Sequence, residues 1–302
     1  MAPKSPRIGL IANPDKRGSD DLLAQLWKEF GDLNVIPVLD QSTAAQFDDP
    51  NLEGLPIQDV AENTDLILIL GGDGTLLWVL RHLGAAVRPL AAINTGTLGF
   101  LTCGTAEDAG DLVQRLVSGD FEISRRSIIR ARLVNESGSG EQEEFHALNE
   151  ISVVRGSNSR VVHIEARING TPMNHYTGDG LIVATPTGST AYSLSAGGPI
   201  AAPDAEVFAI TPICPHALTN RPIVVSDQAR IDLEIPDQRD QLLMMVDGQR
   251  VARMDRSATI QIRRATFDLP LITLPGSTFY GVLHQKLGWS GSAIASNGKR
   301  KK

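Results

Sequence analysis

A short apolar run that ends in a glycine-rich loop constrains the fold of this chain more than any other feature. The run is Leu66–Leu70, and Gly71-Gly72-Asp73-Gly74-Thr75 follows it directly, before a helical-looking segment at 76–80. A buried strand is therefore predicted to end in a loop that carries one carboxylate, that of Asp73. Glycines suit a place where backbone N–H groups approach phosphate oxygens, because they have no Cβ to obstruct the approach. The alternative is an ordinary tight turn with Asp73 as a helix N-cap.

A second glycine-rich stretch, residues 178–199, contains a short apolar strand at 181–184 followed by many hydroxyl groups. Loops of this length usually exist for ligands, since they do not bury their own backbone cheaply. The hydroxyls suit a sugar, a base or a phosphate, and the ring of Tyr192 can lie against a ring. They belong to Thr187, Ser189, Thr190, Ser193 and Ser195. A flexible linker is the alternative, but the embedded prolines and apolar residues argue against it.

The first third of the chain alternates apolar strands with segments of helical period. Ser19 is a possible cap for a helix at 20–30, and Thr105 to Asp108 resembles a capping box for the helix that follows. This alternation predicts a Rossmann-like parallel sheet with ligands at the carboxyl ends of its strands. The predicted strands lie at 8–12, 35–39, 66–70 and 90–93.

The pattern changes after about residue 122, where β-branched residues and period-two alternation dominate. Asn169-Gly170 lies between two candidate strands and Asp247-Gly248 follows another, and both pairs are typical of type I′ hairpin turns. This half is predicted to form an antiparallel sandwich. The candidate strands lie at 128–134, 145–154, 161–168, 229–235 and 259–263.

Composition narrows the classes of function. The net charge of −7 and the isoelectric point near 5.4 argue against non-specific nucleic-acid binding, but not against a nucleotide ligand. No apolar stretch is long enough to span a bilayer, and no secretory signal is recognisable at the N-terminus. The two cysteines, Cys103 and Cys214, fit a reducing cytoplasm rather than a disulfide framework. No protein metal site is predicted, because the histidines lack the spacing of zinc ligands.

In combination, these motifs resemble the NAD kinase family, and the resemblance runs from about residue 7 to 289. The long motif at 178–199 is the specific one, because phosphofructokinases and diacylglycerol-type lipid kinases share Gly-Gly-Asp-Gly. Further matches are Asn94-Thr95-Gly96-Thr97-Leu98-Gly99-Phe100, Asn149-Glu150, Pro212-Ile213-Cys214-Pro215-His216, Asn220-Arg221-Pro222, Asp247-Gly248-Gln249 and Lys286-Leu287-Gly288-Trp289.

The resemblance implies a Rossmann-like ATP-binding domain at 1–125 and a β-sandwich NAD-binding domain at 126–270. A segment at 271–302 would return to the first domain, with a basic tail to which no function is assigned. The implied reaction moves the γ-phosphoryl group of ATP to the 2′-hydroxyl of the adenosine ribose of NAD, giving NADP. Asp73 would be the general base. Mg²⁺ would arrive with ATP, and a homodimer or homotetramer is implied.

The same resemblance assigns substrate contacts residue by residue. Gly72, Gly74 and Thr75 would shape the triphosphate site, and Phe100 would form a wall of the adenine pocket. The remaining contacts would come from Asn149, Glu150, Arg160, Thr177, Asp179, Thr187, Thr190, Ala191, Tyr192, Ser193, Leu194, Ser195 and Gln249. Each group also has a plainer interpretation: a strand-start pair for Asn149-Glu150, a core aromatic for Phe100 and a solvated arginine for Arg160.

Thr177 departs from the family pattern, since many members carry an arginine there. Strict preference for NAD over NADH is therefore in doubt, as is the exclusion of polyphosphate as a donor. Two other functions remain open on the sequence. A lipid kinase shares the first motif but should lack the second, and a non-catalytic NAD(P) sensor of this fold would have no use for Asp73.

Overall fold

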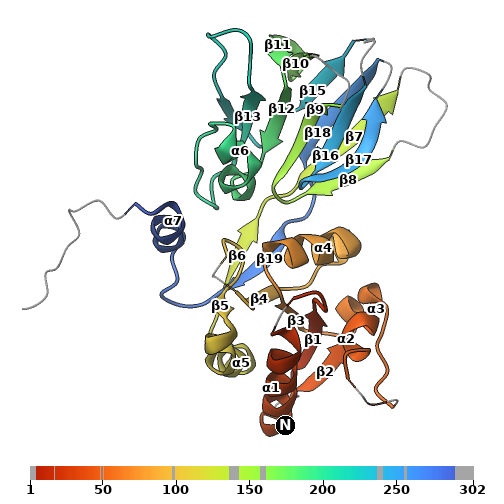
Figure 1. The fold of residues 1–302 in the computed structure, drawn as a ribbon, viewed down its shortest axis with the longest axis vertical. Helices are drawn as coiled ribbons and strands as arrows, with labels where there is room; N and C mark the ends of the chain where they lie inside the picture. Colours follow the sequence, from red (N-terminus) through yellow and green to blue (C-terminus); the bar gives the residue numbers. More distant parts are fainter. Residues whose placement is uncertain are drawn as a thin grey trace, which may run out of the picture. The chain divides into compact units, whose positions relative to one another are not determined.

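The computed structural model describes residues 5–16, 18–47, 49, 51–96, 99–135, 143–156, 161–236, 241–254 and 257–289. The chain divides into two units (Figure 1). The first unit holds residues up to Val79, Arg88–Ile123 and the chain from Leu271 onward, and the second holds Leu80–Val87 and Ser124–Pro270. Each unit has its own apolar core. None of the described helices combines the length and hydrophobicity that a membrane-spanning helix needs.

The first unit is built on a largely parallel sheet with strand order β2-β1-β3-β4-β19-β6, and β5 pairs with β4. The pairs β1–β2, β1–β3, β3–β4, β4–β5 and β4–β19 are all parallel. Parallel strands covered on both faces should be continuously apolar, and β3 is buried along its whole length. The strands are β1 (Arg7–Ala12), β2 (Ile36–Leu39), β3 (Leu66–Leu70), β4 (Leu90–Asn94), β5 (Gly104–Thr105), β6 (Glu122–Arg126) and β19 (Leu269–Thr273).

Helices cover this sheet, and α1 packs beside α5 over the face formed by alternate residues of β1, β3 and β4. The capping box of Thr105 and Asp108 is present, and it caps a 3-10 turn that leads into α5. Ser19 is not the cap of α1: Gly18 holds that position, and Ser19 is buried inside the first turn. The helices of the first unit are α1 (Ser19–Asp32), α2 (Gln41–Ala44), α3 (Ile57–Glu62), α4 (Asp73–Leu83), η2 (Ala106–Asp108), α5 (Ala109–Ser118) and α7 (Phe279–Leu287). The last turn of α4 and the turn η1 (Gly84–Ala86) belong to the second unit.

The second unit is a sandwich of antiparallel sheets. One sheet has the order β11-β10-β15-β18-β7-β8 and the other has the order β14-β13-β12-β9-β16-β17. A shared apolar core lies between them, to which both sheets contribute alternate residues such as Ile129, Ile151 and Ile262. The strands are β7 (Ile129–Asn135), β8 (Glu144–Ala147), β9 (Glu150–Arg155), β10 (Val162–Ile168), β11 (Thr171–Gly178), β12 (Gly180–Ala184), β13 (Val207–Ile213), β14 (Ile223–Ser226), β15 (Ile231–Ile235), β16 (Leu242–Val246), β17 (Gln249–Met254) and β18 (Ala258–Arg264).

Local details follow the turn chemistry of the sequence. Asn169-Gly170 and Asp247-Gly248 both have positive φ angles, as a type I′ hairpin turn requires. The predicted strand at 145–154 is wrong in one respect, because it breaks at Leu148 and Asn149 into β8 and β9, which belong to different sheets. Hydrogen bonds from both of these backbone N–H groups to a side chain replace the ladder at the break.

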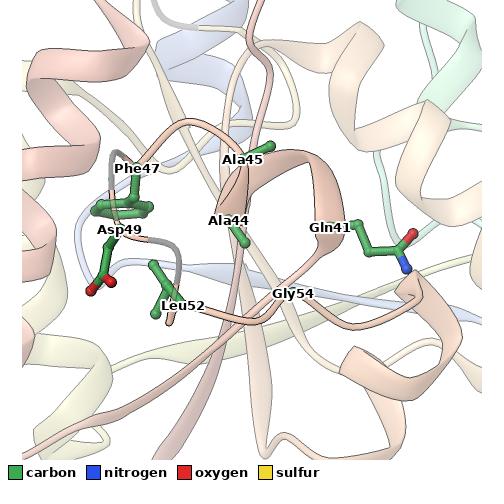
Figure 2. A pocket seen from close by; sticks show the side chains of 7 residues that line it. All are labelled: Gln41, Ala44, Ala45, Phe47, Asp49, Leu52 and Gly54. Atoms are coloured by element: carbon green, nitrogen blue, oxygen red, sulfur yellow. The ribbon is translucent and has the colours of Figure 1, made fainter.

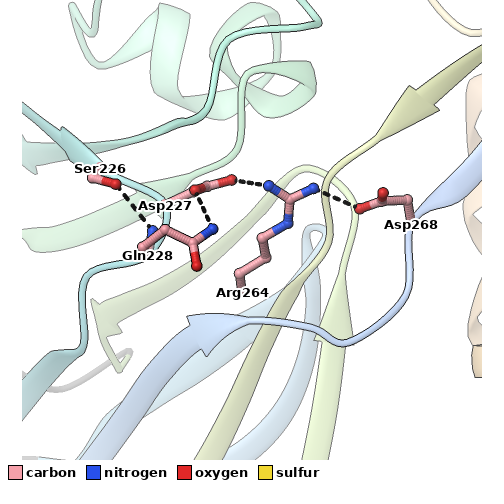
Figure 3. A network of polar contacts seen from close by, with 5 residues as sticks. All are labelled: Ser226, Asp227, Gln228, Arg264 and Asp268. Carbon is pink, nitrogen blue, oxygen red and sulfur yellow. Dashed lines mark hydrogen bonds and ion pairs between the residues drawn. The ribbon is translucent and has the colours of Figure 1, made fainter.

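An ion-pair network built around a buried aspartate joins two segments of the second unit (Figure 3). Asp227 is fully buried, and its carboxylate pairs with Arg264 and accepts a hydrogen bond of 2.9 Å from the Gln228 side chain. Arg264 also reaches Asp268 at 2.9 Å. A buried carboxylate needs such partners because its desolvation would otherwise be costly. The network therefore fixes the segment between β18 and β19 against the end of β14.

Candidate active site

The predicted glycine loop, Gly71 to Thr75, lies at the carboxyl edge of the parallel sheet in the first unit. It follows β3 and leads into α4, which begins at Asp73. Backbone bonds fasten the loop to both neighbouring strands: Gly71 N–H donates to Ile93 O at 2.9 Å, and Asn13 N–H donates to Leu70 O at 3.1 Å. The loop thus occupies the edge where open α/β sheets bind their ligands.

Asp73 is oriented by two backbone donors. Its Oδ2 accepts from Phe100 N–H at 3.1 Å and its Oδ1 accepts from Leu101 N–H at 3.1 Å. A helix N-cap would instead accept from the first turn of its own helix. Gly99 allows this approach, since a Cβ there would stand 2.9 Å from Asp73 Cγ. The chain therefore brings the two predicted site residues Asp73 and Phe100 together through the main chain of residues 99–101.

Some of the other residues of the glycine loop are packed inside the unit, and others are open to solvent. Thr75 is buried, and its Oγ1 accepts from the Asn13 side chain at 3.1 Å. Gly72 is half-buried beside the Asn94 side chain, whereas Gly74 is exposed with open space where a Cβ would be. Asn13 was not among the predicted site residues, although a polar residue directly after a parallel strand is a usable signal.

In the second unit, Asp247 organises the start of β9. Its carboxylate accepts three backbone hydrogen bonds, from Leu148 at 3.1 Å, Asn149 at 2.7 Å and Glu150 at 3.1 Å. The Asp247 N–H donates back to Glu150 O at 3.0 Å. The hairpin interpretation of Asp247-Gly248 is therefore correct but incomplete, because the side chain also holds the predicted pair Asn149-Glu150. Asp247 was matched to the family motif but was not among the predicted site residues.

Glu150 is unusually placed for an acid. Its side chain is 3% exposed, and its Oε2 has no hydrogen-bond partner among the described residues. Burial, together with the nearby charge of Asp247, raises the pKa of Glu150 to about 7, although a hydrogen bond from Tyr192 N–H opposes the shift. Burial also raises the pKa of Asp247, against the effect of its three backbone donors and of Arg81. Two neighbouring buried carboxyls compete for negative charge, and this keeps Glu150 partly protonated near neutral pH.

The hydroxyl-rich segment after β12 forms the turn η3 (Thr187–Thr190) and the short helix α6 (Tyr192–Ser195). Several of its hydroxyls form hydrogen bonds within the second unit. Ser193 Oγ lies 3.1 Å from Thr211 Oγ1, and Thr190 Oγ1 donates to Thr187 O at 3.1 Å. The buried side chains are those of Thr187, Ser189 and Ser193, whereas Tyr192 and Ser195 are exposed and Thr190, Ala191 and Leu194 are half-buried.

This segment packs closely against Asn149. Thr185 N–H donates to Asn149 O at 2.9 Å, and a Cβ on Gly188 would stand 2.6 Å from Asn149 Cα. The Tyr192 N–H that reaches Glu150 extends the same contact. The predicted residues Asn149, Glu150 and Tyr192 therefore belong to a common cluster within the second unit.

Thr177 and Asp179 lie at the corner between β11 and β12. Asp179 forms an ion pair with Arg155 at 3.0 Å, and Thr177 Oγ1 lies 3.1 Å from His163 Nδ1. Gln249, the first residue of β17, accepts a hydrogen bond from Arg81. Arg160 lies outside the described residues. No finding tests the substrate contacts assigned to these side chains, so they remain predictions.

A separate pocket of about 530 Å³ opens beside the segment that follows β2 in the first unit (Figure 2). It is lined by Gln41, Ala44, Ala45, Phe47, Asp49, Leu52 and Gly54. None of the predicted site residues lines it. In the described part of the chain, no three His, Cys, Asp or Glu side chains converge as a metal site requires.

Comparisons with known proteins agree on one family. Residues 8–121 match the family model of the ATP-NAD kinase N-terminal domain, and residues 148–274 match that of the ATP-NAD kinase C-terminal domain. An NAD kinase from Caldanaerobacter subterraneus subsp. tengcongensis is 37% identical over 281 residues, which cover 93% of this chain and 98% of that protein.

Solved structures extend the comparison. Yeast NADH kinase complexed with NADH superposes with a TM-score of 0.85 at 25% identity, covering 99% of this chain and 90% of that one. An NAD kinase from Archaeoglobus fulgidus in complex with ATP gives 0.71 at 26% identity, covering 94% of this chain and 100% of that one. Both family models, together with the relatives over nearly the full length, lead to one conclusion. The chain belongs to the NAD kinase family of phosphotransferases.

Proposed function

We propose that this chain transfers the γ-phosphoryl group of ATP to the 2′-hydroxyl of the adenosine ribose of NAD, with Asp73 as the general base. The observation that carries the proposal is the Asp73 carboxylate, held by the N–H groups of Phe100 and Leu101 at the end of a glycine loop. A ribose hydroxyl is a poor nucleophile until its proton is removed, so a positioned carboxylate has a clear task there. Phosphoryl transfer needs little else from the protein besides positioning and charge stabilisation.

The glycine loop is assigned to the triphosphate. Gly74 is exposed and Gly72 half-buried, so their backbone can approach phosphate oxygens without obstruction by side chains. The Asn13 side chain donates a hydrogen bond to Thr75 Oγ1, and this bond fixes the first turn of α4. Phe100 is assigned to the adenine pocket, and its N–H already contacts Asp73.

The second unit is assigned to NAD. The cluster of Asn149, Glu150 and the hydroxyl-rich segment provides amide, carboxyl and hydroxyl groups of the kind that bind ribose and base edges. Tyr192 is exposed and can stack on a ring, and Ser195 is exposed beside it in α6. Buried hydroxyls such as that of Ser193 support the shape of the loop through Thr211.

The residues present fit a divalent ion that is bound mainly by phosphate oxygens. Mg²⁺ is usually held by one or two carboxylates plus substrate phosphates, and the described part of the chain gathers no set of three acidic or histidine side chains. When bound, the ion would neutralise charge on the β- and γ-phosphates. Asp73 remains available to accept the proton of the ribose hydroxyl.

NADH is an expected second substrate. Thr177 bears no charge, and its hydroxyl is paired with His163. The related yeast kinase was crystallised with NADH. A homodimer or homotetramer and a cytoplasmic location stay predictions of the family resemblance.

The experiment is NADP formation by the full chain with NAD, ATP and Mg²⁺, with NADH and polyphosphate as alternative substrates. Asp73→Asn should lower kcat by about 10²- to 10⁴-fold, since it removes general-base catalysis. Calorimetry should show that NAD still binds to this variant. Asp65→Asn is the matched control, because Asp65 accepts a hydrogen bond from Arg7 N–H at the opposite end of β3.

Two outcomes would contradict the proposal. An active Asp73→Asn enzyme would remove Asp73 from the role of base. A wild-type chain that binds NAD but forms no phosphorylated product with any donor would favour a non-catalytic sensor.

A further inference from the structure

A group of arginines occupies the outer face of the sheet that contains β7 and β18. These strands are antiparallel, with Arg130 opposite Arg263 and Arg132 opposite Gln261. The alternating residues Ile129 and Ala131 point into the sandwich core. The arginines between them therefore point outward, away from that core.

The four polar side chains enclose a small cavity of about 90 Å³. We call this cavity the arginine pocket, and its lining is Arg130, Arg132, Gln261 and Arg263. A water molecule occupies about 30 Å³ of the liquid. The arginine pocket therefore has room for a single tetrahedral oxyanion, with any remainder of the ligand outside it.

The positive charge of the arginine pocket is incompletely balanced. Glu144 on the neighbouring β8 lies 2.8 Å from Arg132 Nε and 3.8 Å from Arg130 Nη1. Its pKa is raised by burial, but the hydrogen bond from Arg132 and the neighbouring positive charges lower it overall, so it is ionised. Within the described residues, the side chain of Arg263 forms no ion pair and no hydrogen bond. Within the described part of the chain, one carboxylate thus pairs with two of the three guanidinium groups, and the third has no carboxylate partner.

The acids on the strand beyond β18 do not restore the balance. Asp232 on β15 pairs with Arg230 at 2.8 Å, and Glu234 on the same strand pairs with Arg167 at 3.5 Å. Both carboxylates are therefore engaged with other arginines.

Like charges directly opposite each other on neighbouring strands destabilise a sheet. An anion between Arg130 and Arg263 would remove that repulsion. The planar fork of arginine matches phosphate oxygens with two parallel hydrogen bonds, and the Gln261 amide adds an uncharged donor. We propose that the arginine pocket binds the phosphate group of a small phosphorylated molecule. None of the residues assigned to NAD or ATP lines this pocket, so the proposal goes beyond the kinase reaction.

The test is calorimetric titration of the full chain with inorganic phosphate and, separately, with inorganic pyrophosphate. Any binding to the glycine loop will occur in wild type and variants alike, so the comparison isolates the arginine pocket. Arg263→Gln should weaken the pocket's binding by at least about tenfold, which is the loss expected from one charged hydrogen-bonding group. Arg167→Gln is the matched control, because it removes an arginine from the same outer face at its pair with Glu234.

A thermal-melt series provides a second readout. Without phosphate, Arg263→Gln should melt at or above the wild-type temperature, since the repulsion with Arg130 is gone. With phosphate, wild type and Arg167→Gln should gain more stability than Arg263→Gln, because only Arg263→Gln lacks the site in the arginine pocket. Arg263→Lys, which keeps the charge but loses the fork, replaces the glutamine variant if that variant does not fold.

The two titrants distinguish the source of the phosphate. Tighter binding of pyrophosphate would indicate a polyphosphorylated ligand, and preference for inorganic phosphate would indicate the free ion. Identical isotherms for wild type and Arg263→Gln would overturn the proposal. An equal loss in Arg167→Gln would also overturn it, by showing a general effect of charge.

Discussion

The glycine loop of the first unit and the hydroxyl-rich cluster of the second unit hold their predicted site residues by different kinds of group. Main-chain groups position Asp73, because its carboxylate accepts hydrogen bonds from the N–H groups of residues 100 and 101. A side chain positions Asn149, because the Asp247 carboxylate accepts hydrogen bonds from three consecutive N–H groups. We call the first arrangement the main-chain cradle and the second the side-chain cradle. The main-chain cradle tolerates few substitutions at its glycines, whereas the side-chain cradle depends on the charge of one residue.

The largest expected effect is on the side-chain cradle. Asp247→Ala would leave three partly buried N–H groups without a protein acceptor, at a cost of roughly 3–5 kcal/mol in the free energy of unfolding. NAD affinity should fall as well, because Asn149 and Glu150 lose their support. Chemical denaturation and NAD calorimetry measure both effects. Unchanged stability would mean that the hairpin turn alone holds the start of β9.

The main-chain cradle should respond in rate rather than in stability. In Gly99→Ala, the new Cβ would displace the Asp73 carboxylate, and misplacement of a catalytic group by about 1 Å costs about 10²-fold in rate, or roughly 3 kcal/mol. Steady-state kinetics should show the loss in kcat with little change in the Kd for NAD. Gly31→Ala is the matched control, because it adds a Cβ within α1, where no atom other than those of the helix itself lies within 4 Å of the Cβ position. Equal losses in both variants would indicate a general effect of the added methyl group instead.

Glu150 gives a smaller effect that depends on pH. Its pKa is raised from 4.5 to about 7 in the folded state, so the folded protein binds more protons than the unfolded chain between these values. Wild-type stability should therefore fall as pH rises from about 4.5 to 7, by no more than about 3 kcal/mol. Glu150→Gln should remove this slope and be the more stable protein at pH 8. Denaturation curves across pH 4.5–8 test this, and parallel slopes for the two proteins would contradict the environment described for Glu150.

The smallest effect is expected at Asn13. Asn13→Ala removes one side-chain hydrogen bond to Thr75, which is worth about 1 kcal/mol. The KM for ATP should rise a few-fold while the KM for NAD is unchanged. A change in the KM for NAD instead would contradict the assignment of the glycine loop to the triphosphate.

Much of the fold was predictable because its signals are local. The buried strand Leu66–Leu70 was predicted with its correct ends, and the I′ turns at Asn169 and Asp247 followed from residue pairs that adopt positive φ. The cap of α1 was predicted wrongly: Ser19 has the side chain of a cap but lies inside the first turn, and Gly18, whose backbone is left-handed, holds the cap position. The break between β8 and β9 was missed because the apolar residues on both sides of it suggested one continuous strand, although the polar pair Asn149-Glu150 lies at the break.

The sequence by itself determined the two architectures and the family, and it predicted the chemical groups of the candidate site, because strand period, glycine loops and runs of hydroxyl residues are patterns of neighbouring residues. Only the tertiary structure decided which groups are held and by what. Asp247 is 97 residues from Glu150 in the chain, and Arg263 is opposite Arg130 only because β7 and β18 pair. Contacts at such separation depend on sheet register, and register is set by the whole core rather than by any local pattern.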